Sequence, residues 1–117
     1  MKIKTAELTG PALDWAVAKC EDLEVWREPD GIYLCEGGEV GFMFRPSTSW
    51  QEGGPIIERE EIYLAKSVLG GWTASIYICE KGINCIMHSG PTPLIAAMRC
   101  YVASKLGEEI DIPEELG

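Results

Sequence analysis

The sequence predicts an α+β fold in which an antiparallel sheet of about four or five strands is flanked by three helices. Two observations predict this class. Apolar residues recur at helical spacing near both ends of the chain, and the spacing changes to a two-residue alternation at Leu23 and again at Trp72. A chain of 117 residues is long enough for one core, so we expect a single domain over residues 1–117.

The first predicted helix covers residues 10–22. Thr9 is a favourable N-cap, and Pro11 lies in the first turn, where its missing amide costs no hydrogen bond. An apolar stripe at helical spacing begins at Leu13. Trp15 lies off that stripe, so it either packs on a neighbouring element or contacts a partner.

Three short strands are expected next, at residues 23–28, 32–36 and 40–45. Pro29-Asp30-Gly31 and Gly37-Gly38 are typical turn sequences between them. Connections this short favour an antiparallel meander.

An irregular loop is predicted at residues 46–55, and a short helix at 55–61. Clean alternation then predicts a strand at 72–78, which the turn Glu80-Lys81-Gly82 joins to a returning strand at 83–88. The last helix is predicted at 92–106, with Gly107 as its C-cap. Because this helix is apolar on nearly all sides, we expect it to be the most buried element.

The chain is acidic, with 19 acidic and 10 basic residues and a net charge of −9. Five of the acids lie in residues 108–117, which read as a solvated, partly mobile acidic tail. The other interpretation of the tail is a surface that mimics nucleic acid or docks on a basic partner. Direct binding to nucleic acid is not expected, because no cluster of Lys and Arg could neutralise phosphates.

No apolar run approaches the ~20 residues of a membrane span, and the first residues lack the apolar core of a signal peptide. We therefore expect no membrane association and a place in the cytoplasm.

The five cysteines, at 20, 35, 79, 85 and 100, show no paired metal-ligand spacing, and His88 is the single histidine. We expect no metal site and no cofactor. Cys79 and Cys85 would face each other across the predicted hairpin, but in a reducing cytoplasm all five are expected to be thiols.

Arg99 is the most informative candidate for a binding residue. A guanidinium within an apolar helix needs a carboxylate or several carbonyls if it is buried. Glu58 and Asp14 are the expected partners. Arg99 would then form either a structural ion pair between helices or an anion-binding site.

Two Gly-Pro segments at predicted helix starts are further candidates for binding. Free backbone amides at a helix start can hold phosphate or carboxylate, although neither segment is a Walker loop. Trp50 lies beside the first segment as a candidate aromatic anchor. The segments consist of Gly53, Gly54 and Pro55, and of Gly90, Pro91, Thr92 and Pro93.

No set of residues marks a catalytic centre. The sequence has no Gly-x-Ser-x-Gly motif, and its lone histidine follows Met87 on a predicted strand. We name no catalytic residue and do not expect an enzyme.

Three segments resemble the NinX-like family of phage proteins, a family of unknown function, and the related phage alpha-beta-alpha sandwich domain. They are ELTG at 7–10 with LDWAVA at 13–18, PST at 46–48 with Trp50 and GGPIIERE at 53–60, and GPTPLIAAMRCYVASKLG at 90–107. The closing IPEEL at 112–116 fits as well. The resemblance implies a sheet between helices in a phage or prophage protein that acts inside a bacterial cell. It implies no activity. The family pattern usually has Asp where this chain has Ser49, so a function that needs that carboxylate does not transfer.

Two functions remain open at this point. The first is an accessory phage protein that binds a host or phage macromolecule without chemistry of its own, and a homodimer is compatible with it. The second is a small-ligand, anion-binding or enzymatic site formed by the 46–55 loop, the 90–93 loop and Arg99. A concave pocket lined by these residues would favour the second function, and a flat or convex surface the first.

Overall fold

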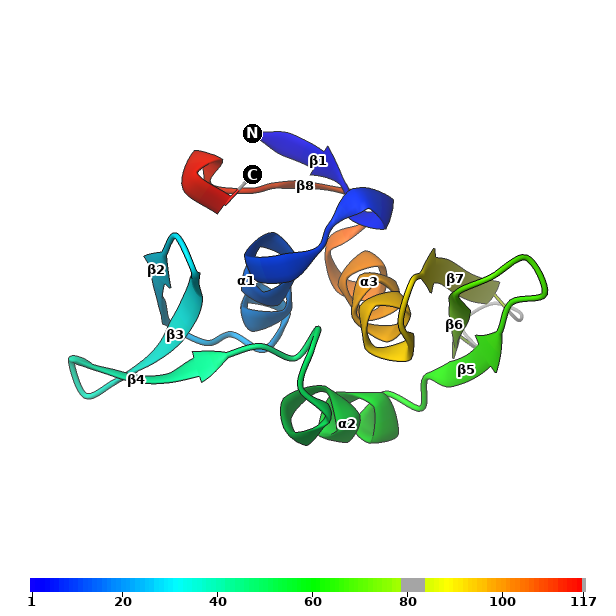
Figure 1. Cartoon of the computed structure of the whole chain (residues 1–117), viewed down its shortest axis with the longest axis horizontal. Coiled ribbons are helices and arrows are strands. Elements are labelled where there is room, and N and C mark those ends of the chain that lie inside the picture. Colours follow the sequence, from blue (N-terminus) through cyan, green and yellow to red (C-terminus); the bar gives the residue numbers. More distant parts are fainter. Residues whose placement is uncertain (79–83, 117) are drawn as a thin grey trace.

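The computed structural model describes residues 1–78 and 84–116, and within them it contains three α-helices and three small antiparallel sheets (Figure 1). The predicted α+β class is confirmed. The helices are α1 (Gly10–Cys20), α2 (Trp50–Arg59) and α3 (Pro93–Leu106). The strands are β1 (Lys2–Lys4), β2 (Val25–Glu28), β3 (Gly31–Glu36), β4 (Glu39–Phe44), β5 (Tyr63–Lys66), β6 (Trp72–Ile78), β7 (Asn84–Gly90) and β8 (Glu109–Asp111). Two short 3₁₀ helices are η1 (Thr5–Glu7) and η2 (Glu114–Leu116).

The strands form three separate sheets, in the orders β1-β8, β2-β3-β4 and β5-β6-β7. The expectation of one sheet built from residues 23–45 and 72–88 is therefore corrected. The two three-stranded meanders lie on opposite sides of the helical layer, where β3 packs on α1 and β6 and β7 pack on α3 (Figure 1). Each meander covers a different helix, so the two cannot pair with each other.

Helix α3 lies at the centre of the molecule, between α1 and the β5-β6-β7 sheet (Figure 1). Thr92 caps its start by accepting a hydrogen bond from the Ile95 amide at 3.1 Å, and Pro93 occupies its first turn. Gly107 ends the helix with φ at 93°, a conformation that favours glycine. The expectation that this helix is the most buried element is confirmed by its buried residues Leu94, Ala96, Ala97, Met98, Cys100, Tyr101, Val102 and Ala103.

Helix α2 begins at Trp50, earlier than predicted, so residues 50–55 of the expected 46–55 loop are helical. The Ser49 carbonyl accepts hydrogen bonds from the amides of Glu52 and Gly53 at 3.2 and 2.8 Å. Gly53 and Gly54 consequently lie in the helix, as does Pro55. The backbone amides of this segment were expected to be free at a helix start, but the Gly53 amide donates to the Ser49 carbonyl and Gly54 lies inside the helix.

Strands β1 and β8 join the two ends of the described chain, with Lys2 opposite Asp111 and Lys4 opposite Glu109. Ile110 and Ile112 are buried beneath this ribbon. The expectation of a solvated, partly mobile tail is therefore corrected for residues 109–112, which are built into the fold. The predicted turn at 80–82 and the Cys79 thiol lie outside the described residues.

Among the residues that the structure describes, no helix is both long enough and apolar enough to cross a membrane.

Candidate functional site

The segment before α2 packs against the start of α3, as the sequence predicted. Ser47, Thr48 and Trp50 line one side of a cavity of about 220 Å³, and residues 92–95 line the other. The contact is close, because a Cβ atom added to Gly53 would lie 2.6 Å from Cδ2 of Leu94. Trp50 itself stays half exposed at the rim. Whether this cavity binds a ligand stays a prediction.

Arg99 does not belong to this cavity, and the expected carboxylate partners are wrong. Its Nε donates to the Leu8 carbonyl at 2.7 Å, and its Nη1 donates to the Ser89 carbonyl at 3.0 Å. Glu58 is exposed on α2, and Asp14 instead accepts a hydrogen bond from the Ser47 amide at 2.9 Å. Partial burial lowers the pKa of Arg99. Arg99 therefore joins α3 to the N-terminal segment and to β7 through two backbone carbonyls. Carbonyls were the predicted alternative to a carboxylate partner.

The start of α3 offers few free amides to an anion. Pro93 has none, the Ile95 amide is capped by Thr92, and the Ala96 amide donates to the Thr92 carbonyl at 3.0 Å. Gly90 ends β7 opposite Trp72, and Pro91 follows as an exposed residue. Since no basic side chain lines the cavity among the described residues, the geometry gives no support for an anion site there.

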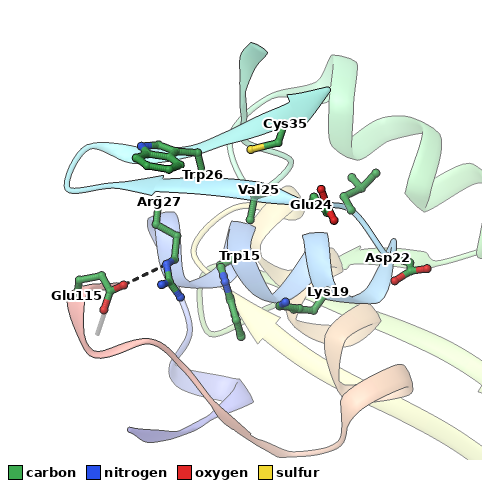
Figure 2. Close-up of a pocket in the computed structure, with 10 residues that line it drawn as sticks. Trp15, Lys19, Asp22, Glu24, Val25, Trp26, Arg27, Cys35 and Glu115 are labelled. Carbon is green, nitrogen blue, oxygen red and sulfur yellow. Dashed lines mark ion pairs between the residues drawn. The ribbon is translucent and has the colours of Figure 1, made fainter. Parts of the chain in front are cut away.

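A cleft of about 530 Å³ lies between α1, β2 and the C-terminal segment (Figure 2). Its two basic groups are already engaged. Lys19 Nζ lies 5.2 Å from the centre of the Trp15 ring, and Arg27 Nε lies 3.0 Å from Oε1 of Glu115. Trp15, which lies off the apolar stripe of α1, is half buried in this cleft. With Asp22 and Glu24 also in the lining, the cleft contains more acids than bases.

A second cleft, of about 380 Å³, lies on the outer face of the β2-β3-β4 sheet; we call it the Trp26–Tyr33 cleft. Trp26, Glu28, Asp30, Tyr33 and Val40 line it. Trp26 and Tyr33 are direct cross-strand neighbours, and Trp26 projects from the side of β2 opposite to Val25 and Arg27 (Figure 2). The lining therefore combines two aromatic rings with two carboxylates.

Hydrogen bonds hold both rings of this cleft. The Trp26 indole N–H donates to Oε1 of Glu28 at 2.6 Å, and the Tyr33 hydroxyl donates to Oδ2 of Asp30 at 2.9 Å. The bond to Asp30 raises the pKa of Tyr33. No basic side chain lies in the lining among the described residues, so neither carboxylate is neutralised there. This cleft was not among the sites predicted from the sequence, although the Pro29-Asp30-Gly31 turn and the alternation on either side of it contained the signal.

Within residues 1–78 and 84–116, the polar clusters offer no metal site, and the thiols of Cys20 and Cys100 are not activated nucleophiles. No group of three His, Cys, Asp or Glu side chains is placed to hold a metal ion. Burial raises the pKa of both Cys20 and Cys100 to about 12, which leaves these thiols protonated and unreactive.

A family model described as Bacteriophage P22, NinX matches residues 4–105. The match covers α1, α2 and all of α3 except its last residue, together with the first two quoted segments and the third as far as residue 105. Among curated proteins, no match to the chain is found. The family match brings no indicated activity. It covers well over half of the chain, and the chain therefore belongs to the bacteriophage P22 NinX family.

Proposed function

We propose that this protein is an accessory phage protein that works in the host cytoplasm by binding a basic segment of a host or phage protein, without catalysis. Membership of a phage family supports the setting. The net charge of −9 supports a basic partner and opposes nucleic acid, because like charges repel over the distances at which the two would meet.

The observation that carries the proposal is the Trp26–Tyr33 cleft. A Lys or Arg side chain placed over an aromatic face is attracted by the ring quadrupole, by about 0.5–1 kcal/mol at exposed sites. A nearby carboxylate adds an ion pair. The cleft presents two rings and the carboxylates of Glu28 and Asp30 together, and its lining contributes no competing base within the described residues.

The hydrogen bonds within the cleft prepare it for a cation. Because the Tyr33 hydroxyl donates to Asp30, the phenol ring gains electron density and attracts a cation more strongly. The bond from Trp26 to Glu28 holds the indole against the sheet and so lowers the entropy lost on binding. Each carboxylate keeps a second oxygen for the ligand.

The test is calorimetric titration with a short peptide rich in arginine and lysine. Wild-type protein should bind it. Replacing both acids isosterically, in the Glu28→Gln and Asp30→Asn double variant, should weaken binding about tenfold, since two ion pairs of ~0.7 kcal/mol are lost. The matched control is Glu58→Gln with Glu61→Gln, which removes the same charge from exposed positions on and just after α2.

If the two double variants weaken peptide binding equally, net charge alone attracts the peptide and the cleft is not its binding site. Absence of binding by the wild-type protein would end the proposal. Affinity capture from phage-infected cells with the same three proteins then identifies the partner as the protein that only the Glu28→Gln and Asp30→Asn variant fails to retain.

A further inference from the structure

We propose that the cavity between the starts of α2 and α3 binds a small, uncharged, ring-shaped molecule that carries an amide group. Ser47, Thr48 and Trp50 form one wall of this α2–α3 cavity, and residues 92–95 form the other. It shares no lining residue with the Trp26–Tyr33 cleft, so the inference is independent of the function proposed above. Its starting point is a buried hydroxyl in the first wall.

The hydroxyl of Ser47 is a buried polar group without a partner. Ser47 is 1% exposed, and its Oγ is the only buried side-chain nitrogen or oxygen that forms no hydrogen bond within the described part of the chain. The Ser47 amide, in contrast, donates to Asp14 at 2.9 Å. A buried hydroxyl that has lost its water and gained no bond costs free energy. A ligand that bonds to Ser47 removes this cost.

The carboxyl of Asp14 is the internal group that comes nearest to satisfying this hydroxyl. Burial raises the pKa of Asp14, and the amide and the hydroxyl of Ser47 both lower it, so the hydroxyl acts on the carboxyl. The two groups nevertheless do not reach the geometry of a hydrogen bond. The bonding capacity of the Ser47 hydroxyl is therefore available at the cavity wall.

The rest of the lining selects an uncharged ligand with an apolar body. Trp50, Pro93, Leu94 and Ile95 supply rings and aliphatic side chains, and no charged residue lines the cavity in residues 1–78 and 84–116. An ion would lose its hydration here without meeting a counter-charge, whereas a neutral molecule loses much less. Apolar walls with a few polar groups are typical of sites for small molecules.

The volume of the cavity limits the ligand to about one ring. An apolar cavity of about 150 Å³ accommodates benzene, so about 220 Å³ accommodates a ring with one polar substituent. Trp50 is half exposed at the rim, where its indole can stack on such a ring. The walls are also fixed in place, because Gly53 leaves no room for a Cβ atom between the Pro46 carbonyl and Leu94. A preformed cavity lowers the entropy lost on binding.

An amide matches the polar groups of the two walls. The Ser47 hydroxyl can donate to a carbonyl or accept from an N–H group. On the other wall, Thr92 Oγ1 accepts from the Ile95 amide at 3.1 Å and keeps its own proton for donation. An amide presents both an acceptor and donors, so it can pair with either hydroxyl, whereas a hydrocarbon ring leaves Ser47 unpaired.

Three probes of similar shape test the proposal: benzamide, benzoate and toluene. In an NMR titration of the ¹⁵N-labelled protein, benzamide should shift the amide signals of residues 47–50 and 92–95. Its dissociation constant should be of the order of a millimolar, as expected for so few atoms. Benzoate should leave these signals unchanged, because its charge finds no partner in the cavity.

Ser47→Ala is the decisive variant. It should weaken benzamide about tenfold and leave toluene unchanged, because toluene makes no bond to the hydroxyl. It should also raise the midpoint of thermal unfolding of the free protein, since an unpaired buried hydroxyl is removed. Ser75→Ala is the matched control, because Ser75 is also buried, at 9% exposure, but lies on β6 outside the lining. Trp50→Ala should weaken benzamide and toluene alike.

Each opposite result overturns the proposal. If benzamide at 20 mM, about twenty times the expected constant, shifts no signal of the two walls, the cavity holds only water. If Ser47→Ala lowers the midpoint of unfolding, the hydroxyl is bonded within the protein, to Asp14, and does not serve a ligand. If Ser47→Ala and Ser75→Ala affect benzamide equally, or if Trp50→Ala changes neither ring probe, the probes bind elsewhere. The dispersion of the NMR spectra shows that each variant is folded.

Discussion

At the residue scale, the carboxyl of Asp14 is a group whose ionisation opposes folding. Asp14 lies on α1 with 5% of its surface exposed, and it accepts a hydrogen bond from the Ser47 amide at 2.9 Å. Burial raises its pKa from 3.8 to about 6; the amide bond opposes that rise, and the charge of Glu52 adds slightly to it. The folded protein therefore holds a proton at a pH where the unfolded chain has lost it.

The sign of the resulting pH dependence follows from linkage. Since the pKa of Asp14 is higher in the folded state, its stabilising effect is complete below about pH 4 and is lost as the pH rises through about 6. A shift of about two units corresponds to roughly 3 kcal/mol. Asp14→Asn removes the ionisable group, so the difference in unfolding free energy between Asp14→Asn and wild type should rise by about that amount from pH 4 to pH 7. Urea unfolding across this range measures it, and parallel stability curves for the two proteins would contradict it.

At the element scale, α2 tests how tertiary contact overrides local preference. Glycine in the middle of a helix costs roughly 0.5–1 kcal/mol relative to alanine, and two adjacent glycines before Pro55 therefore read as loop. In the structure, a Cβ atom on Gly53 would collide with the Pro46 carbonyl and with Leu94, whereas one on Gly54 would meet only the Trp50 ring, at 3.9 Å. Gly53 is thus required by packing, and Gly54 is not.

The two glycines form a matched pair of substitutions. Gly54→Ala should stabilise the protein by about 0.5–1 kcal/mol, because it removes backbone entropy from the unfolded state at no steric cost. Gly53→Ala should destabilise it by about 1–3 kcal/mol through overpacking against a backbone carbonyl that cannot move freely. Chemical denaturation of both variants gives the two values. Equal changes of the same sign would show that Gly53 does not hold α2 against α3.

The contrast between local preference and tertiary contact also explains which elements could be predicted from the sequence. Local signals mark helices α1 and α3, which have a favourable N-cap residue and a proline in the first turn. Strand β6 is marked by its clear two-residue periodicity. Strand β1 has only three residues and pairs with a strand more than a hundred positions away, so no local pattern marks it. The contact between residues 47–50 and 92–95 could be predicted, because both segments are locally rigid. Predicting the Trp26–Tyr33 cleft would have required the register of the β2–β3 hairpin. Predicting the partners of Arg99 would have required the position of the Leu8 carbonyl.

At the scale of the whole molecule, strands β1 and β8 close the fold by joining segments that carry opposite charges. Lys2 and Lys4 lie opposite Asp111 and Glu109, and the amine of Met1 lies 2.7 Å from Oδ1 of Asp111. These charges are exposed, and exposed ion pairs contribute only about 0–1 kcal/mol. Beneath them, Ile110 and Ile112 are 7% and 1% exposed. Apolar burial should therefore hold the C-terminal segment much more strongly than its charges do.

Two multiple variants separate these contributions. Ile110→Ala with Ile112→Ala should lower the unfolding free energy by about 4 kcal/mol or more, since a buried isoleucine costs ~2–5 kcal/mol when it is cut back to alanine. The loss would be a large fraction of the 5–15 kcal/mol that stabilises an ordinary domain. Replacing Glu109 and Glu115 by Gln together with Asp111 by Asn, here called the Gln variant, should change stability by only about 1 kcal/mol, although Asp111 pairs with the Met1 amine and Glu115 with Arg27. Thermal unfolding at low and high salt measures both variants. A larger loss in the Gln variant, reproduced in the wild-type protein by high salt, would mean that charge and not apolar burial holds the two ends of the described chain together.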